Sequence, residues 1–257
     1  MRIAVMGTAG QGKTTLINDF IANWPLYKKP SSDYRDLLKD KNYPHSKNCS
    51  KEGQWAILNC LIDEMQKYSK TDKVIFDRGP LDVLVYSLWA CEMQSSDIDE
   101  AFIQKLIPIV KESLNHLDLI FFVPITKHAP IKIVDNGIRD TDPQYIDEID
   151  NIFKALFHEY QHGLGKTPFF SAEDCPAIIE IFGKPQERIL LIQQYLNVEG
   201  EVIGEEADTI LNPENIEELE KLILEQADAD KKEKYLKEQE QMVKDFVKNE
   251  KIKSKRS

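Results

Sequence analysis

The sequence predicts a three-layer α/β fold, in which a five-stranded parallel β-sheet lies between two layers of helices and a charged helical tail follows at the C-terminus. Two observations favour this fold. Short apolar runs of strand length alternate with longer segments whose apolar residues recur at helical spacing, and a glycine-rich loop separates the first run from the first such segment. Strands that alternate with helices form parallel sheets, and these sheets bind ligands at the carboxyl ends of their strands.

The first strand and helix flank a complete phosphate-binding loop. Apolar residues fill positions 3–6, apolar residues recur at helical spacing over 16–21, and Gly7 to Thr14 read Gly-x-x-x-x-Gly-Lys-Thr. In such a loop, backbone N–H groups and the helix dipole attract an anion, the lysine reaches the terminal phosphates and the threonine hydroxyl binds Mg²⁺. The sequence therefore predicts a nucleoside triphosphate site with the contacts Gly7, Gly10, Gln11, Gly12, Lys13, Thr14 and Thr15.

The same patterns assign the remaining elements of the sheet and its helices. We expect helices over 51–68, 80–88, 98–115 and 144–160, and strands over 73–76, 117–123 and 177–182. Pro80 suits the first turn of its helix, and a further helix follows Gly183 and extends to Tyr195. Prolines at positions 25, 30 and 44 predict irregular structure from Trp24 to Tyr43.

The chain changes character after the last predicted strand and helix. We expect a globular P-loop domain over residues 1–197 and a helical extension over 198–226, in which Asn212 caps a helix and Pro213 occupies its first position. Residues 227–257 are dominated by Lys, Glu and Gln, and their apolar residues are too sparse to build a core. This last segment is predicted to be a charged helical or disordered tail.

Composition limits the classes of function. The chain has 257 residues, of which 42% are hydrophobic, and this is enough for one α/β domain with a sizeable core. The net charge of −11 is unfavourable for broad binding to a nucleic-acid backbone. The four cysteines include no Cys-x-x-Cys pair and are expected to be reduced thiols of a cytoplasmic protein. The first apolar run is too short for a signal peptide, and no segment approaches a membrane span, so no membrane association is expected.

A second motif, Asp77-Arg78-Gly79-Pro80-Leu81-Asp82, begins at the end of a predicted core strand. In P-loop phosphotransferases this position lies beside the γ-phosphate, where a carboxylate can orient Mg²⁺ waters or accept a hydroxyl proton and an arginine stabilises the transferring charge. The alternative is structural: Asp77 caps the following helix and Arg78 forms a surface ion pair. Asp82 has two possible roles. It can contact an acceptor hydroxyl, or it can interact favourably with the N-terminal dipole of the helix.

The two motifs, Gly-Thr-Ala-Gly-Gln-Gly-Lys-Thr-Thr-Leu and Val-Ile-Phe-Asp-Arg-Gly-Pro-Leu-Asp, together resemble those of a family of small P-loop kinases. The family is typified by the bacterial nicotinamide riboside kinase domain and includes, more distantly, thymidylate and deoxynucleoside kinases. The resemblance covers residues 1–196 and implies ATP as phosphoryl donor, Mg²⁺ as cofactor and a nucleoside-like small molecule as acceptor. By position it implies that Lys13 and Thr14 hold phosphates and Mg²⁺, that Asp77 is a base or a ligand of metal-bound water, and that Arg78 assists transfer.

The resemblance implies three further assignments. Arg139, in the segment 135–139, occupies the position of a lid arginine that closes over the phosphates, and an exposed arginine in a turn is the alternative. Lys184 and Pro185 follow the last strand, where the family packs a loop against adenine, and a plain strand-to-helix turn is the alternative. The acceptor contacts of the family fall at three adjacent residues, Asp33, Tyr34 and Arg35.

Two rival motifs are weaker. Residues His158 to His162 read His-Glu-x-x-His, which on a stable helix places two zinc ligands on one face beside a general base. Gly163 and Gly165 follow at once, so the second histidine is expected at a helix end, and the sequence offers no convincing third ligand. A regulatory GTPase would need Asn-Lys-x-Asp to specify guanine, and the nearest string, at residues 126–129, lacks the carboxylate.

The sequence therefore predicts an ATP- and Mg²⁺-dependent kinase for a nucleoside, a nucleotide or a nicotinamide-riboside-like acceptor. Two alternatives stay open. One is a kinase of modified, hydroxymethylated bases in DNA, which the acidic charge disfavours and which would need a basic groove near Arg78 and Arg139. The other is a non-catalytic, ATP-dependent interaction protein whose C-terminal tail docks a partner. Assembly as a homodimer also stays open.

Overall fold

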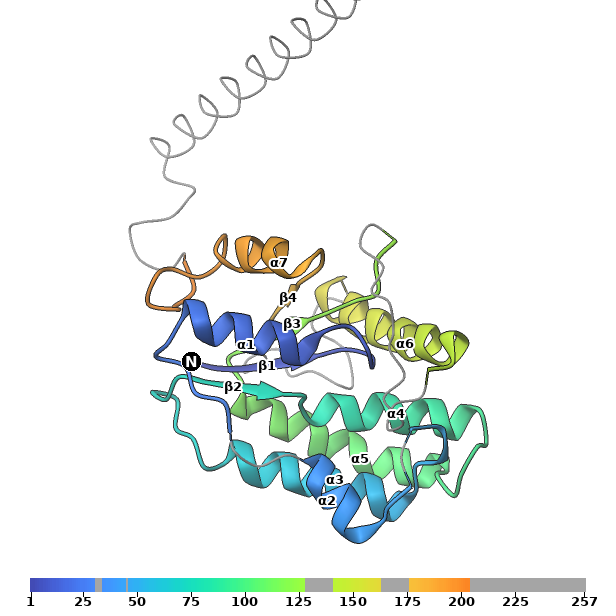
Figure 1. The fold of residues 1–257 in the computed structure, drawn as a ribbon. Coiled ribbons are helices and arrows are strands. Elements are labelled where there is room, and N and C mark those ends of the chain that lie inside the picture. Colours follow the sequence, from blue (N-terminus) through green and yellow to red (C-terminus); the bar gives the residue numbers. More distant parts are fainter. Residues whose placement is uncertain (31–33, 45, 128–140, 163–175, 204–257) are drawn as a thin grey trace, which may run out of the picture. The chain divides into compact units, whose positions relative to one another are not determined.

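Four parallel strands form a sheet in the part of the chain that the structure describes (Figure 1). The computed structural model describes residues 1–30, 34–44, 46–127, 141–162 and 176–203. The strands are β1 (Arg2–Met6), β2 (Val74–Asp77), β3 (Leu119–Phe122) and β4 (Ala177–Glu180), and their order across the sheet is β2-β1-β3-β4. The described helices are α1 (Lys13–Asn23), α2 (Tyr34–Lys41), α3 (Lys51–Met65), α4 (Pro80–Glu92), α5 (Glu100–Ser113), α6 (Pro143–His162) and α7 (Pro185–Ile192), with short 3₁₀ helices at Ser46–Asn48 and Leu114–His116.

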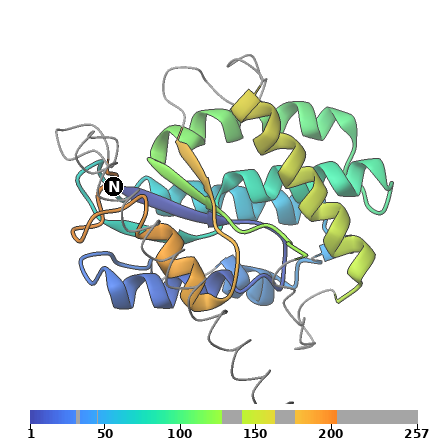
Figure 2. The ribbon, with the colours of Figure 1, turned by 90° about the horizontal axis from the view of Figure 1, so that it is seen from above.

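Helices cover both faces of this sheet, as Figures 1 and 2 show. Side chains alternate between the two faces of a strand, so in β1 Ala4 and Met6 join one buried cluster while Ile3 and Val5 join the other. The first cluster is completed by α3, α4, α5 and α6, and the second by α1 and α7. Each strand is therefore held by apolar packing above and below, which confirms the predicted three layers.

The parallel register brings the carboxyl ends of the strands to one edge of the sheet. Val5 of β1 pairs with Asp77 of β2, and Met6 pairs with Phe122 of β3. The loop that begins at Gly7 therefore leaves the sheet between the ends of β2 and β3. This is the edge at which parallel α/β sheets bind their ligands.

The predicted number of five strands is wrong for the described residues, whose sheet has four strands. At the free edge of β2, where a further strand could pair, a single β-bridge occurs. Lys28 pairs with Val74 in the parallel sense, and its N–H donates to the carbonyl of Lys73 at 3.0 Å. Pro25 and Pro30 lie on either side, and a proline has no N–H to extend such a ladder. The segment thus caps the edge of the sheet without becoming a strand.

The prediction of irregular structure over Trp24 to Tyr43 is wrong for its second half, which contains α2. Tyr34, Leu37 and Leu38 recur at the i, i+3, i+4 spacing of a helix, but the repeat is only one turn long. The sequence prediction gave more weight to the nearby prolines than to this single helical turn. The helix contacts α3, and this contact fixes its place.

The described chain up to Glu201 forms one unit, and the second unit, residues 202–257, lies outside the described residues except at its first two positions. The predicted extension and charged tail therefore stay predictions. Two hydrogen bonds close the end of the first unit: Trp24 Nε1 donates to the carbonyl of Asn197 at 2.8 Å, and the Tyr27 hydroxyl donates to that of Gly200 at 2.7 Å. They attach the segment after α7 to the end of α1.

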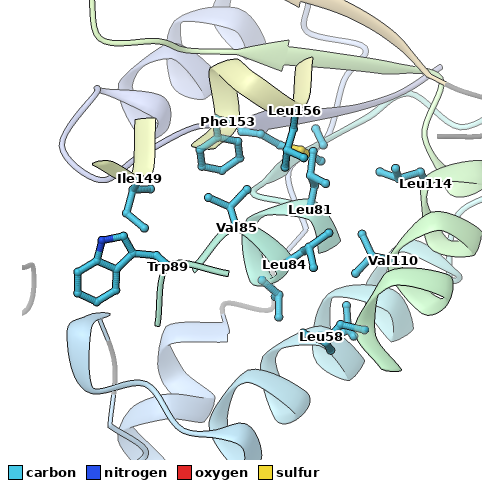
Figure 3. Close-up of a cluster of buried hydrophobic side chains, with 14 of the residues drawn as sticks. Leu58, Leu81, Leu84, Val85, Trp89, Val110, Leu114, Ile149, Phe153 and Leu156 are labelled. Carbon is cyan, nitrogen blue, oxygen red and sulfur yellow. The ribbon is translucent and has the colours of Figure 1, made fainter. Parts of the chain in front are cut away.

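Helix α4 lies inside the larger cluster and contacts α3, α5 and α6 (Figure 3). Leu81, Leu84 and Val85 of α4 are fully buried against Val110 of α5 and Phe153 of α6. A helix that is buried on several sides is held rigidly by close packing. The residues that precede and begin α4 are therefore fixed in place.

We expect Leu84→Ala to lower the free energy of unfolding by about 2–5 kcal/mol, because it removes a fully buried side chain and leaves a cavity. Urea unfolding measures this change. Leu190→Ala is the matched control, since Leu190 is 60% exposed and its truncation should change stability by no more than about 0.5 kcal/mol. Equal losses in the two variants would contradict the assigned core.

Candidate nucleotide and acceptor site

A cavity of about 390 Å³ opens beside the phosphate-binding loop, and its size is typical of a small-molecule site. One end is formed by the loop itself, from Ala9 to Thr15. The other end is formed by side chains of α2, α3, α4 and α6 and of the segment 42–49. These elements are far apart in the sequence, and the fold brings them together at the carboxyl edge of β1.

Glycines give the loop its shape at two critical positions. Gly7 has φ of +136°, and a Cβ atom there would lie 2.6 Å from the carbonyl oxygen of Val123, which follows β3. Gly12 has φ of +73° and is the N-cap of α1. Because a side chain is strained or excluded at these positions, the glycines allow the backbone to turn sharply back before the helix begins.

Lys13 lies inside the curve of the loop. The residue is 6% exposed, and its ammonium group donates hydrogen bonds to the carbonyls of Gly7, at 2.8 Å, and Thr8. The packing of α1 against the sheet through Leu16 and Ile17 fixes the helix start from which Lys13 projects. The loop therefore already contains a positive charge at the position where the motif predicts the terminal phosphates.

Thr14 and Asp77 are in direct contact. The Thr14 hydroxyl donates to Asp77 Oδ2 at 3.0 Å, and the ammonium group of Lys29 lies 3.9 Å from the same oxygen. The Asp77 side chain is only 7% exposed. Mg²⁺ prefers oxygen ligands and is commonly bound by one or two protein groups together with phosphates, so this hydroxyl and carboxylate fit such an ion.

Arg78 is buried between two aromatic rings. Its guanidinium carbon lies 5.7 Å from the ring centre of Tyr34 and 5.2 Å from that of Tyr86, and its Nη1 donates to Asp82 Oδ1 at 2.9 Å. Its side chain is 12% exposed, so Arg78 does not form the surface ion pair that was one alternative. Its backbone has φ of +86°, which is strained for a residue with a side chain.

Asp82 connects Arg78 to the start of α4. Its second oxygen, Oδ2, accepts a hydrogen bond from the N–H of Gly79 at 3.0 Å, and Gly79 rather than Asp77 is the N-cap of this helix. Burial raises the pKa of the Asp82 carboxyl above its ordinary value, and the charges of Arg78 and Lys13 offset part of this shift. Both carboxylate oxygens of Asp82 are therefore engaged in positioning Arg78 and capping the helix.

A smaller cavity of about 160 Å³ adjoins the first and is lined by Asp77. Tyr34, Leu61 and Arg78 line both cavities. Arg78 thus lies between the carboxylate of Asp77 and the larger space. A ligand group that reaches Arg78 from the larger cavity comes close to the Thr14–Asp77 pair.

The structure describes only part of the other predicted contacts. Tyr34 lines the cavity, whereas Asp33, the side chain of Arg35 and Arg139 lie outside the described residues. Lys184 and Pro185 are exposed at the start of α7 and do not line either cavity. Their predicted contact with adenine stays a prediction.

Sequence reasoning missed Arg188, which connects α7 to the phosphate-binding loop. The residue is 4% exposed, its Nη1 donates to the carbonyl of Gln11 at 2.7 Å, and its Nε donates to that of Gly183 at 2.8 Å. Burial lowers the pKa of its guanidinium from the ordinary value. Arg188 lies one helical turn before the buried Ile192, and this spacing is a signal that could have identified it as inward-facing.

Sequence reasoning also missed most of the cavity wall. Tyr43, Gln54, Tyr86 and Tyr145 line it, and they come from four separate segments. Aromatic residues at helical spacing are usually core residues, so nothing local in the sequence marks Tyr86 or Tyr145 as part of a site.

The His-Glu-x-x-His string occupies the last residues of α6, which runs to His162. His158 is exposed. Among the described residues no group of three or more His, Cys, Asp or Glu could hold a metal ion. Likewise, no helix in the described ranges is long and apolar enough to cross a membrane.

Comparisons with known proteins agree with this fold. A family model described as an AAA domain matches residues 2–170. The solved structure of deoxyadenosine kinase from M. mycoides with the products dCMP and a flexible dCDP bound has a TM-score of 0.55 at 13% identity, over 75% of this chain and 97% of that chain. A search of curated proteins gave no match.

Two solved structures of NadR are also similar. NadR in complex with NR has a TM-score of 0.53 at 14% identity, over 80% of this chain and 54% of that chain. NadR in complex with NAD and AMP-PNP has a TM-score of 0.52 at 15% identity, over 80% of this chain and 51% of that chain. This chain spans about half the length of NadR. At such identities the likeness concerns the fold, and the predicted resemblance to small P-loop kinases is confirmed at that level.

We expect Lys13→Ala to weaken binding of an ATP analogue by at least about tenfold, because it removes the charge inside the loop that faces the phosphates. Isothermal titration calorimetry measures the affinity, and circular dichroism checks the fold. Lys105→Ala, at an exposed position of α5, is the control and should bind like the wild type. Unchanged affinity in a folded Lys13→Ala variant would contradict the phosphate site.

Proposed function

This chain belongs to the AAA domain family, and we propose that it is an ATP- and Mg²⁺-dependent kinase that transfers a phosphoryl group to a nucleoside-type acceptor. The observation that carries the proposal is the position of Arg78. Arg78 lines both cavities. The larger cavity is lined both by the phosphate-binding loop and by the aromatic residues Tyr34, Tyr43, Tyr86 and Tyr145, which we call the aromatic chamber. A triphosphate on the loop and a flat acceptor in the chamber would therefore meet beside the contact between Thr14 and Asp77.

The residues at this meeting point suit an in-line transfer. The acceptor oxygen would form a bond to the γ-phosphorus while the bond from that phosphorus to the bridging oxygen breaks, and the electron pair would leave with the diphosphate. The hydroxyl proton would pass to the carboxylate of Asp77. Lys13 and Arg78 would stabilise the charge on the transferring group.

The Thr14 hydroxyl and Asp77 carboxylate are the groups that would hold Mg²⁺. When bound, the ion would neutralise charge on the β- and γ-phosphates. The contact of Asp77 with Thr14 and its nearness to Lys29 keep the carboxylate directed toward the loop. Asp77 would act on the acceptor directly or through metal-bound water.

The cavity is also relevant to the two alternative functions, a kinase of modified bases in DNA and a non-catalytic, ATP-dependent interaction protein. Arg78 is buried and paired with Asp82, so it does not contribute to the exposed basic groove that action on DNA would need. A non-catalytic, ATP-dependent interaction protein would not need the aromatic side chains that line the cavity next to the loop. Both observations favour a small-molecule acceptor.

A transfer screen with ATP labelled at the γ-phosphate tests the proposal. The acceptors are nucleosides, nucleotides, nicotinamide riboside and hydroxymethylated DNA, and Lys13→Ala is the inactive control. A labelled small molecule is the expected product. Label found only in DNA would favour the DNA kinase, and label found only in inorganic phosphate would favour the ATPase.

Asp77→Asn should lower kcat by roughly 100-fold or more, because the amide keeps the shape of the side chain but cannot accept the hydroxyl proton. The melting temperature should change little. Turnover with the accepted substrate and thermal unfolding are measured on the same preparation. A lower melting temperature with normal turnover would mean that Asp77 has a structural role only.

Arg139 is proposed to close over the phosphates from the loop between residues 124 and 143, since a closing cation excludes water from the transfer. Arg139→Ala should leave ATP binding near normal and depress transfer. Limited proteolysis should show that this loop is protected when an ATP analogue and the acceptor are added together. Normal transfer by the variant, with full protection by nucleotide alone, would contradict the lid.

A further inference from the structure

We propose that Arg188 is a positioning residue of the phosphate-binding loop, which holds the peptide between Gln11 and Gly12 in the orientation that binds the phosphates of the nucleotide. This role rests on the proposed function, which supplies the triphosphate. Arg188 lines neither of the two cavities. Its effect on a ligand is therefore transmitted through the backbone of the loop.

Packing and two hydrogen bonds fix the side chain of Arg188. Helix α7 lies against α1 (Figure 1), and Ile192 of α7 joins the buried cluster that contains Leu16 of α1. Arg188 lies one turn before Ile192 and is 4% exposed. Its guanidinium donates from Nε to the carbonyl of Gly183 at 2.8 Å and from Nη1 to the carbonyl of Gln11 at 2.7 Å. A planar guanidinium that donates in two directions at once has a fixed orientation.

The hydrogen bond to Gln11 determines the direction of the next backbone N–H group. A trans peptide is planar, so the N–H of Gly12 points to the side opposite the carbonyl of Gln11 and hence away from Arg188. This N–H donates no backbone hydrogen bond within the described part of the chain. Gly10 and Gly12 have φ of +79° and +73°, and N–H groups in such a turn form a concavity that binds anions. Arg188 thus orients one of the donors that the loop offers to a phosphate.

The charge of Arg188 also favours an anionic ligand on the loop. Arg188 forms no ion pair with a carboxylate of the described residues, and burial lowers the pKa of its guanidinium. By contrast Arg2, which is 3% exposed, is paired with Asp118 at 2.9 Å. A buried charge without an opposite charge is costly. A triphosphate on the loop would supply negative charge beside the peptide that Arg188 holds.

Arg188 contacts two parts of the expected nucleotide site, and the loop is the part that depends on it. The segment that begins at Gly183 has another constraint, because the N–H of Lys184 donates to Glu187 Oε2 at 2.8 Å and this bond caps α7. The carbonyl of Gln11, however, accepts from Arg188 alone among the residues that the structure describes. Loss of Arg188 should therefore release the Gln11–Gly12 peptide and leave the start of α7 in place.

The test compares the binding of two probes, AMP-PNP and inorganic tripolyphosphate, to the full chain by titration calorimetry with Mg²⁺. Arg188→Met keeps an apolar stem but removes the charge and both donors. We expect it to weaken the binding of both probes by about tenfold or more, because both use the phosphate-binding loop. Arg188→Lys keeps the charge but cannot donate to both carbonyls from one plane, so its loss should be intermediate.

Arg2→Met is the matched control. Arg2 is as deeply buried as Arg188, but its partners, Asp118 and the carbonyl of Asn115, lie beside the start of β1 and not beside the loop. This variant removes an ion pair, so it should lower the melting temperature more than Arg188→Met and leave both affinities unchanged. A purely structural role for Arg188 predicts the same pattern for both arginines.

Three results would contradict parts of this account. Unchanged affinity for both probes in the Arg188 variants would overturn the positioning role. A loss confined to AMP-PNP would also overturn it, because Arg188 would then act only through the segment predicted to contact adenine. If the wild-type chain bound neither probe, the phosphate site and the proposed function would both be wrong. Binding of both probes without transfer to any acceptor would contradict the kinase alone and leave the role of Arg188 intact.

Discussion

The pairing of β1 with β2 is the constraint on which the site depends. Val5 lies opposite Asp77, so β2 ends beside the strand that continues into the phosphate-binding loop. As a result, Thr14 and Asp77, which are 63 residues apart, form a hydrogen bond at 3.0 Å. Packed helices on both faces fix the two strands, and this contact is therefore present before any ligand binds. The geometry is preorganised in the way that phosphoryl transfer requires.

The strained backbone of Arg78 follows from the same strand end. Its N–H donates to the carbonyl of Val5 at 3.1 Å, while Gly79 begins the cap of α4 one residue later. The chain must turn sharply between these two fixed points, and the φ of +86° at Arg78 is the result. Strain of this kind persists where surrounding contacts hold it, and here Asp82, Tyr34 and Tyr86 do so. The guanidinium is consequently fixed between the two cavities.

Local motifs predicted the part of the site that is local in sequence. The glycine loop, Lys13 and Thr14 could be placed because a strand, a loop and a helix follow one another within about 20 residues. The aromatic wall could not be predicted, since Tyr43, Tyr86 and Tyr145 meet only through tertiary packing. Arg188 was missed for the same reason: its partner is the carbonyl of Gln11, which is 177 residues away. The predicted count of five strands was wrong because the apolar runs identify only four strands, at 3–6, 73–76, 117–123 and 177–182, and the described sheet contains these four.

The most direct test of the central claim is the affinity of a bisubstrate compound, in which adenosine and the accepted nucleoside are joined through a chain of phosphates. Titration calorimetry with the full chain and Mg²⁺ measures this affinity beside those of ATP and of the nucleoside alone. If one site holds donor and acceptor with Arg78 and Asp77 between them, the joined compound should bind at least about 100-fold more tightly than either part. Binding no tighter than that of ATP would contradict a shared site for transfer.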